Sequence, residues 1–240
     1  MNTLRNPYSG FRYPKEIISH AVWLYYRFAL SYRDVEELLA ARGINVTYET
    51  VRQWCHKFGQ RFANALRRHQ GMLGDTWYLD EVFITIRGQR YYLWRAVDQD
   101  GDVIDILVQK RRDKRAAKAF FLKLLKGTCQ APRRIVTDKL RSYGAARREI
   151  IPSVIHSQGG RLNNRAEVSH QPTRQRERQM RRFKSQGHAQ RFLSAHGPIN
   201  NLFRVGRHLL KAAHYRLFRD RAFATWKQVT CVQNLAEAQF

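Results

Sequence analysis

The first part of the chain carries apolar side chains at helical spacing. Between Pro14 and Phe28 this spacing predicts an amphipathic helix. Its apolar members are Ile17, Ile18, Ala21, Val22, Leu24, Tyr25 and Phe28. A second helix is expected after Ser31, because Asp34 stands at the distance of a capping box, and Gly43 is expected to end it.

A third helix is predicted over residues 47–58, TYETVRQWCHKF. Helix, short turn with glycine and capped helix with a polar outer face form the pattern of a helix-turn-helix DNA-binding unit. A generic three-helix cap on a larger domain fits the same periodicity. Under the first interpretation, Arg52, Gln53 and Lys57 are the best candidates for contacts to a DNA groove or its phosphates.

The apolar period changes after residue 74. Segments 76–86, 90–98 and 103–109 are rich in β-branched and aromatic residues, and short turns separate them. Because short connections indicate hairpins, these segments are predicted to form three antiparallel strands.

Helix and strand then alternate. Asp113 is expected to cap the next helix, with Gly127 just past its end. Residues 133–138 are predicted to form a fourth strand, and the helical crossover before it implies parallel pairing. A short helix near 142–148 and a possible fifth strand at 149–155 follow.

These elements define the expected fold class and domains. The fold class is α/β, a mixed sheet flanked by helices and preceded by a small all-α domain. Residues 1–58 are expected to form the helix-turn-helix domain, and residues 59–74 a linker with a helical piece. Residues 75–187 are expected to form the sheet domain, and residues 188–240 a helical segment that packs on it.

The charge of the chain narrows its partners. The chain has 240 residues, a formal net charge of +25 and 43% hydrophobic residues, enough for a buried core. A compact protein this basic needs a polyanion, and nucleic acid is expected before the alternative, an anionic membrane surface. The sequence has neither a membrane-spanning apolar run nor an apolar signal core, so a cytoplasmic, nucleoid-associated protein is expected.

Acidic residues are scarce, so the positions of three carboxylates are informative. Asp80 lies within the first predicted strand, Asp138 ends the fourth, and Glu167 follows at the start of a helix. Three converging carboxylates repel one another unless divalent cations bind them, and oxygen ligands beside substrate phosphates suit Mg²⁺. Glu81 is expected to point to the opposite face of its strand and is left out of this site.

Each carboxylate also has a plain structural interpretation. Asp80 could bond to neighbouring backbone, Asp138 could shape a turn, and Glu167 could complete a capping box with Asn164. The acidic segment 98–105, DQDGDVID, lacks the spacing of a calcium loop and indicates a polar hairpin turn. Neither a GxSxG nucleophile elbow nor a Walker phosphate loop occurs in the sequence.

Basic residues surround the three carboxylates. Lys139 directly follows Asp138, and an arginine-rich stretch with Arg174, Arg178 and Arg181 follows Glu167. A solvated helix face is the alternative interpretation of these arginines. Next to metals and DNA, contact with phosphates is favoured.

Four stretches in this order carry a resemblance over nearly the whole chain: SYRDVEELLAARGINVTYETVRQW, YLDEVFITIRGQRYYLWRAVD, IVTDKLRSYG and LNNRAEVSHQPTRQRERQMRRFKS. Together they resemble the DDE transposases of bacterial insertion sequences, and more specifically insertion sequence family six. The resemblance implies an RNase H-like catalytic domain behind a helix-turn-helix domain that recognises the terminal inverted repeats of the element.

The resemblance also implies residues and chemistry. It places the catalytic and metal-binding triad on Asp80, Asp138 and Glu167, and a basic residue seven positions later on Arg174. The implied reaction is Mg²⁺-dependent cleavage at the element's ends, with Mn²⁺ as a substitute. The exposed 3′-hydroxyls attack double-stranded target DNA without a covalent protein–DNA intermediate. Cointegrate formation and a homodimer or higher oligomer are implied as well.

Two other functions fit parts of the pattern. A sequence-specific DNA-binding regulator without catalysis would use the sheet domain only to dimerise. A metal-dependent, structure-specific nuclease would cleave DNA without joining it. Short inverted repeats closely flanking the gene would favour transposition over both.

Overall fold

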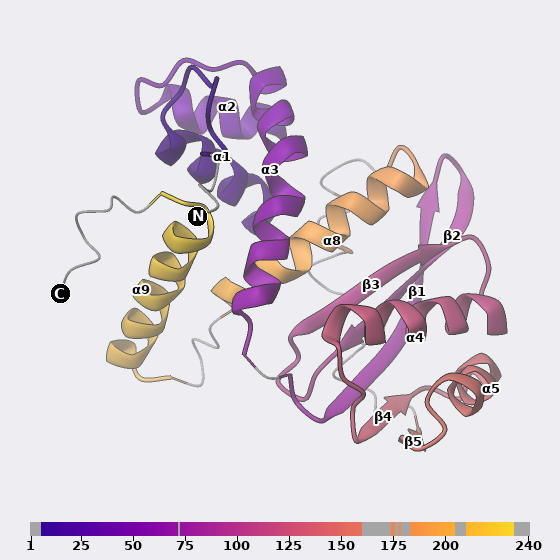
Figure 1. The fold of residues 1–240 in the computed structure, drawn as a ribbon. Coiled ribbons are helices and arrows are strands. Elements are labelled where there is room, and N and C mark those ends of the chain that lie inside the picture. The colour runs from indigo at the N-terminus through magenta and orange to yellow at the C-terminus, as the bar shows by residue number, and fades with distance from the viewer. Residues whose placement is uncertain are drawn as a thin grey trace. The chain divides into compact units, whose positions relative to one another are not determined.

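The computed structural model describes residues 6–71, 73–159, 174–175, 178, 183–204 and 210–232. The chain divides into two compact units, Met1–His69 with Ile199–Phe240, and Gln70–Pro198 (Figure 1). The sequence predicts four segments whose boundaries differ from those of these two units, and that division stays a prediction. Among the described residues, no helix combines the length and the apolar character that a bilayer span requires.

The first unit is helical. It contains α1 (Lys15–Arg27), α2 (Tyr32–Ala40), α3 (Tyr48–His69), the end of α8 (Gln186–Phe203) and α9 (Ala212–Val229). The predicted capping box of α2 is confirmed: the Ser31 hydroxyl accepts from the Asp34 amide at 3.1 Å, and the Asp34 carboxylate accepts from the Ser31 amide at 2.7 Å. Thr47 caps α3 by accepting from the Thr50 amide at 3.3 Å.

Helix α3 is longer than the predicted third helix. Buried Phe62 and Leu66 continue the apolar face beyond Phe58 in steps of four, so the expected linker is helical as far as His69. Residues 188–240 were expected to pack on the sheet domain. That packing stays a prediction. Within this unit, α9 packs on α3, where the rings of Phe62 and Trp226 lie 5.5 Å apart.

The second unit is built on a five-stranded mixed sheet in the order β3-β2-β1-β4-β5. The strands are β1 (Thr76–Ile86), β2 (Gln89–Val97), β3 (Val103–Gln109), β4 (Arg134–Thr137) and β5 (Ile155–Gln158). Strand β2 pairs antiparallel with β1 and β3, whereas β4 pairs parallel with β1 and β5. This order and these directions confirm the predicted mixed α/β fold of RNase H-like type.

Two helices cover one face of this sheet, α4 (Lys114–Thr128) and α5 (Arg141–Ile150). Figure 1 shows α4 lying across this face of the sheet. Together they bury a core whose largest fully buried side chains are Trp77, Leu79, Trp94, Phe120, Phe121 and Tyr143. This packing fixes the middle of β1 and the end of β4, from which the site is built.

The outer edge of the sheet is closed by side chains of α8. Gln190 accepts a hydrogen bond from the Val108 amide at 2.8 Å, and Gln186 donates to the Val108 carbonyl at 2.9 Å. Because β3 is the edge strand, these amides satisfy backbone groups that would otherwise remain open to another strand.

Two predicted boundaries are wrong. The fifth strand begins at Ile155, where the predicted one ends, because Glu149 and Ile150 complete α5 and Pro152 lies in the turn that follows. Gly127 lies inside α4, and Cys129 takes the left-handed position after the helix, with φ of 56°.

Candidate active site

The register of the parallel strand pair brings Asp80 level with Asp138. The β1–β4 ladder ends at the pair Leu79–Thr137, so the next residue of each strand is an aspartate. One Asp138 oxygen accepts from the Leu140 amide at 2.9 Å, which shapes the turn into α5. The other Asp138 oxygen is left to face the side chains at the end of the sheet.

Glu81 joins these two aspartates. Carboxylate oxygens of Asp80, Glu81 and Asp138 lie within 4.8 Å of one another. The prediction that Glu81 lies away from the site is therefore wrong. Strand alternation sets the direction of Cβ only, and β4 ends at Thr137, so no strand separates the longer Glu81 side chain from Asp138.

Burial dominates the electrostatics of Glu81. Its side chain is only 1% exposed. Burial raises the pKa of Glu81 to about 7, and the charge of Asp138 adds to this, while Tyr143 and Arg112 lower it. The Tyr143 hydroxyl lies close enough to interact with this carboxylate, although among the described residues neither that hydroxyl nor Oε2 of Glu81 makes a hydrogen bond of regular geometry. The site therefore contains a buried carboxylate with an oxygen that makes no regular hydrogen bond.

A guanidinium lies against these carboxylates. Arg112 donates from Nε to Glu81 at 2.6 Å and from Nη2 to Asp138 at 3.3 Å. Its position follows from the helix cap beside it, because Asp113 accepts from the Ala116 amide at 2.8 Å and begins α4. Arg112 was not among the predicted site residues. The signal that could have found it is its place directly before a helix cap, in the short connection that follows β3.

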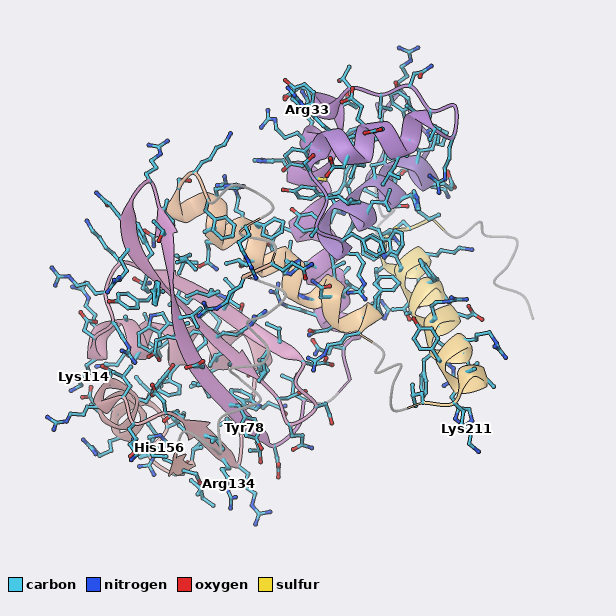
Figure 2. The ribbon with its side chains drawn as sticks, turned by 180° about the vertical axis from the view of Figure 1, so that it is seen from behind. Arg33, Tyr78, Lys114, Arg134, His156 and Lys211 are labelled. Atoms are coloured by element: carbon cyan, nitrogen blue, oxygen red, sulfur yellow. The ribbon has the colours of Figure 1, made fainter. Side chains whose placement is uncertain are left out.

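Hydrogen bonds tie the end of β4 to its neighbour β5. The Thr137 hydroxyl donates to the Asp138 carbonyl at 2.8 Å and lies 2.8 Å from Nε2 of His156, which Figure 2 labels on β5. Since that hydroxyl has one proton, His156 donates to it from Nε2. Burial, and to a smaller extent the charge of Arg147, lower the pKa of His156, which favours the neutral ring. Asp138 thus follows a strand end that is held from two sides.

The remaining predicted residues of this unit are only partly described. Glu167 and Arg181 lie outside the described residues. Arg174 and Arg178 are exposed, and the Arg178 Nε donates to the Arg174 carbonyl at 3.5 Å. Lys139 is exposed next to Asp138.

The predicted DNA-contacting residues of the first unit are all exposed on α3. Arg52 donates two hydrogen bonds to Glu49, at 2.6 and 2.8 Å, and Gln53 donates to the same carboxylate at 3.4 Å. Lys57 lies over the ring of Phe11, 4.4 Å from its centroid. Arg33 of α2, labelled in Figure 2, lies over the ring of Tyr48 at the start of α3. The outer face of the helix pair is therefore basic and aromatic.

Comparison with known proteins identifies relatives over much of the chain. A family model for the DDE domain of IS240-type transposases matches residues 74–206. The transposase for insertion sequence element IS257 in transposon Tn4003 of Staphylococcus aureus is 34% identical over 168 residues, covering 67% of this chain and 75% of that protein. The transposase for insertion sequence-like element IS431mec of S. aureus strain Mu50 has the same identity and coverage.

Solved structures offer a weaker likeness. The HTLV-2 integrase catalytic core domain in complex with magnesium, in its trimeric form, is 14% identical, covering 60% of this chain and 94% of that one, with a TM-score of 0.39. A score this low adds nothing to the sheet topology described above.

The matched DDE domain contains the whole sheet together with Asp80, Asp138 and Glu167. Its relatives are transposases of insertion sequences and match along most of their own length. This chain therefore belongs to the DDE transposases of bacterial insertion sequences, of the insertion sequence family six type, which are metal-dependent polynucleotidyl transferases.

Proposed function

We propose that Asp80, Asp138 and Glu167 are the catalytic carboxylates of this transposase and that they hold Mg²⁺, with Mn²⁺ as a substitute. The observation that carries the proposal is the clustering of Asp80 and Asp138 oxygens where the β1–β4 ladder ends. The role of Glu167 is supported by its place in the matched DDE domain and by the sequence resemblance.

The donor set suits a hard divalent cation. Carboxylate oxygens from three side chains lie within 4.8 Å of one another, and the buried Oε2 of Glu81 makes no hydrogen bond of regular geometry among the described residues. These side chains would hold two such cations, whose chemistry would be activation of the attacking oxygen and stabilisation of the leaving one in phosphoryl transfer. The Leu140 amide orients one Asp138 oxygen, and the other faces the cluster, where it accepts from Arg112.

Basic side chains beside the carboxylates would hold the DNA backbone. Lys139, Arg174 and Arg178 are exposed and carry the positive charge that phosphates require. Arg181 is assigned the same role from its place in the arginine-rich stretch.

Helices α2 and α3 would form the helix-turn-helix that recognises the terminal inverted repeats. Support comes from the two capped helices, the glycine between them and the exposed polar face of α3. Arg52 and Gln53 would contact base edges or phosphates, and Lys57 would contact the backbone. Since Glu49 binds both Arg52 and Gln53 in the free protein, DNA binding requires these side chains to exchange one acceptor for another.

The proposed reaction is cleavage at the ends of the element, followed by direct attack of each 3′-hydroxyl on double-stranded target DNA. No covalent protein–DNA intermediate is needed, and cointegrates are the expected products. Because two ends must be joined to one target, the active form is expected to be a homodimer or a higher oligomer. A cytoplasmic, nucleoid-associated location follows from this function and stays a prediction.

The test is an in vitro reaction with a pre-cleaved element end, Mg²⁺ and a plasmid target. Asp80→Asn, Asp138→Asn and Glu167→Gln should each reduce strand transfer by about 10²–10³-fold or more, with binding to the terminal repeats retained. Asp100→Asn, in the exposed β2–β3 turn, is the matched control and should transfer like wild type. Near-wild-type transfer by any of the three variants would refute the site assignment.

A further inference from the structure

Arg112 lies against the acidic cluster. Its guanidinium is hydrogen-bonded to Glu81 and to Asp138 at the same time, and Asp80 is the third carboxylate of this cluster. A guanidinium and a metal ion both neutralise carboxylates, but they cannot occupy the same space. A divalent cation bound between these carboxylates would therefore meet the guanidinium of Arg112.

Glu81 is the buried partner of Arg112 in this cluster. Its side chain is almost fully buried, and one oxygen is bound to Arg112. The other makes no hydrogen bond of regular geometry among the described residues, with only the neutral hydroxyl of Tyr143 nearby. A buried, unpartnered carboxylate oxygen is costly unless a cation comes close to it. Glu81 therefore has an open ligand position at the cluster, which neither aspartate supplies.

We propose that Glu81 is an additional carboxylate of the metal site and that Arg112 is a resident counter-ion, which must leave the cluster when the divalent cation binds. This rests on the proposed function, since it takes Asp80 and Asp138 as metal ligands. Arg112 is suited to leave because its side chain is 41% exposed and belongs to the connection between β3 and α4. Glu81 stays in place because β1 is a central strand of the sheet.

The experiment measures binding of Mn²⁺ alone to the full-length protein without DNA, by the loss of the free-ion signal in electron paramagnetic resonance. Arg112→Gln removes the competing charge and should tighten Mn²⁺ binding by roughly tenfold. Glu81→Gln removes a ligand and should weaken binding by about tenfold or more. In the double variant the two effects should not add, because Arg112 acts largely through Glu81.

Two further variants separate competition from misfolding and from net charge. Arg112→Lys keeps a positive charge beside Glu81 and should bind Mn²⁺ within a few-fold of wild type. Lys118→Gln removes a positive charge that pairs with Glu149 outside the cluster, and it should leave Mn²⁺ binding unchanged. Equal tightening by Lys118→Gln would show a general charge effect and overturn the proposal. So would unchanged or weaker binding by a folded Arg112→Gln protein.

Asp80→Asn separates failure of this inference from failure of the proposed function. If Asp80→Asn binds Mn²⁺ like wild type, the metal site itself is wrongly placed. If Asp80→Asn loses binding while Arg112→Gln and Glu81→Gln behave like wild type, the metal site stands. In that case Arg112 and Glu81 form only a structural ion pair.

Discussion

Two glutamate–arginine pairs in this transposase have the same chemistry and opposite electrostatics. Glu49 and Arg52 are neighbours on α3, and their side chains are 43% and 44% exposed. The hydrogen bond from Arg52 lowers the pKa of Glu49. Glu81 is 1% exposed beside Arg112, and burial raises its pKa to about 7 despite its arginine. The difference teaches that burial, more than the partner, decides whether an acidic residue is an ordinary surface group or part of a site.

The largest expected difference is in the pH dependence of stability. The pKa of Glu81 is about 7 in the folded protein and has an ordinary value of 4.5. Its contribution to the free energy of unfolding is therefore fully present below pH 4.5 and is lost as the pH rises through 7, where the buried carboxylate becomes charged. Relative to wild type, Glu81→Gln should therefore gain up to about 3 kcal/mol in free energy of unfolding between pH 4.5 and pH 8. Urea unfolding with the metal chelated measures this. A difference between the two proteins that does not vary with pH would contradict the buried, charged state of Glu81.

The next largest difference is expected between Arg112 and Arg52 in their effect on the free energy of unfolding. At pH 8, Arg112→Gln deprives a buried carboxylate of its charged donor and should lower the free energy of unfolding by about 1–2 kcal/mol. Arg52→Gln breaks a solvent-exposed pair and should leave the urea midpoint unchanged. The same urea titration checks both variants. Equal midpoints for the two would mean that burial does not distinguish the pairs.

For binding to the terminal repeats, the exposed Glu49–Arg52 pair should matter more than the buried Glu81–Arg112 pair. Arg52→Ala should weaken binding to the terminal repeats by roughly tenfold or more, since it removes a groove or phosphate contact. Glu49→Gln releases the same arginine and should leave binding equal or tighter. Fluorescence anisotropy with a terminal-repeat duplex measures both, and Lys118→Gln is a charge-matched control. Loss of binding with the control, but not with Arg52→Ala, would refute the role of α3.

The smallest effect is expected at a third acidic residue. The exposed Glu149 binds Lys114 and Lys118, which lower its pKa to about 2. Its contribution to stability is present above pH 4.5 and is lost as the pH falls towards 2. Glu149→Gln should thus be slightly less stable than wild type near pH 7, and this difference in stability should disappear in acid. Thermal unfolding measures this difference, and a difference that widens in acid would mean that the two lysines do not lower the pKa of Glu149.

Much of the fold could be predicted from local pattern. Strands β1 and β3 begin and end as predicted, because turn residues bound each apolar run on both sides. The capping residues Ser31 and Asp113 act as predicted, since a cap is a contact between residues close in sequence. The fifth strand was misplaced because its apolar run, which starts at Ile150, continues from the end of a helix. Periodicity alone cannot separate the two.

The candidate site was predicted less completely. Asp80 and Asp138 could be paired because strand order brings their positions together. Glu81 could not, because its approach depends on where β4 ends, and alternation along β1 carries no such information. The place of Arg112 before a helix cap was a usable signal, but its contacts could not be predicted, since they join residues far apart in the sequence. Such long-range contacts follow from the packed sheet and its loops.

The most direct test of the proposed metal site is cleavage of the protein backbone by Fe²⁺ bound in place of Mg²⁺, with ascorbate and peroxide. Hydroxyl radicals formed at the metal cut the chain close to its ligands, and mass spectrometry locates the cuts. We expect cuts near Asp80, Asp138 and Glu167, all lost in Asp80→Asn and competed by Mg²⁺. Cuts near Asp80 and Asp138 without any near Glu167, or cuts that persist in Asp80→Asn, would contradict a single metal site built from these three carboxylates.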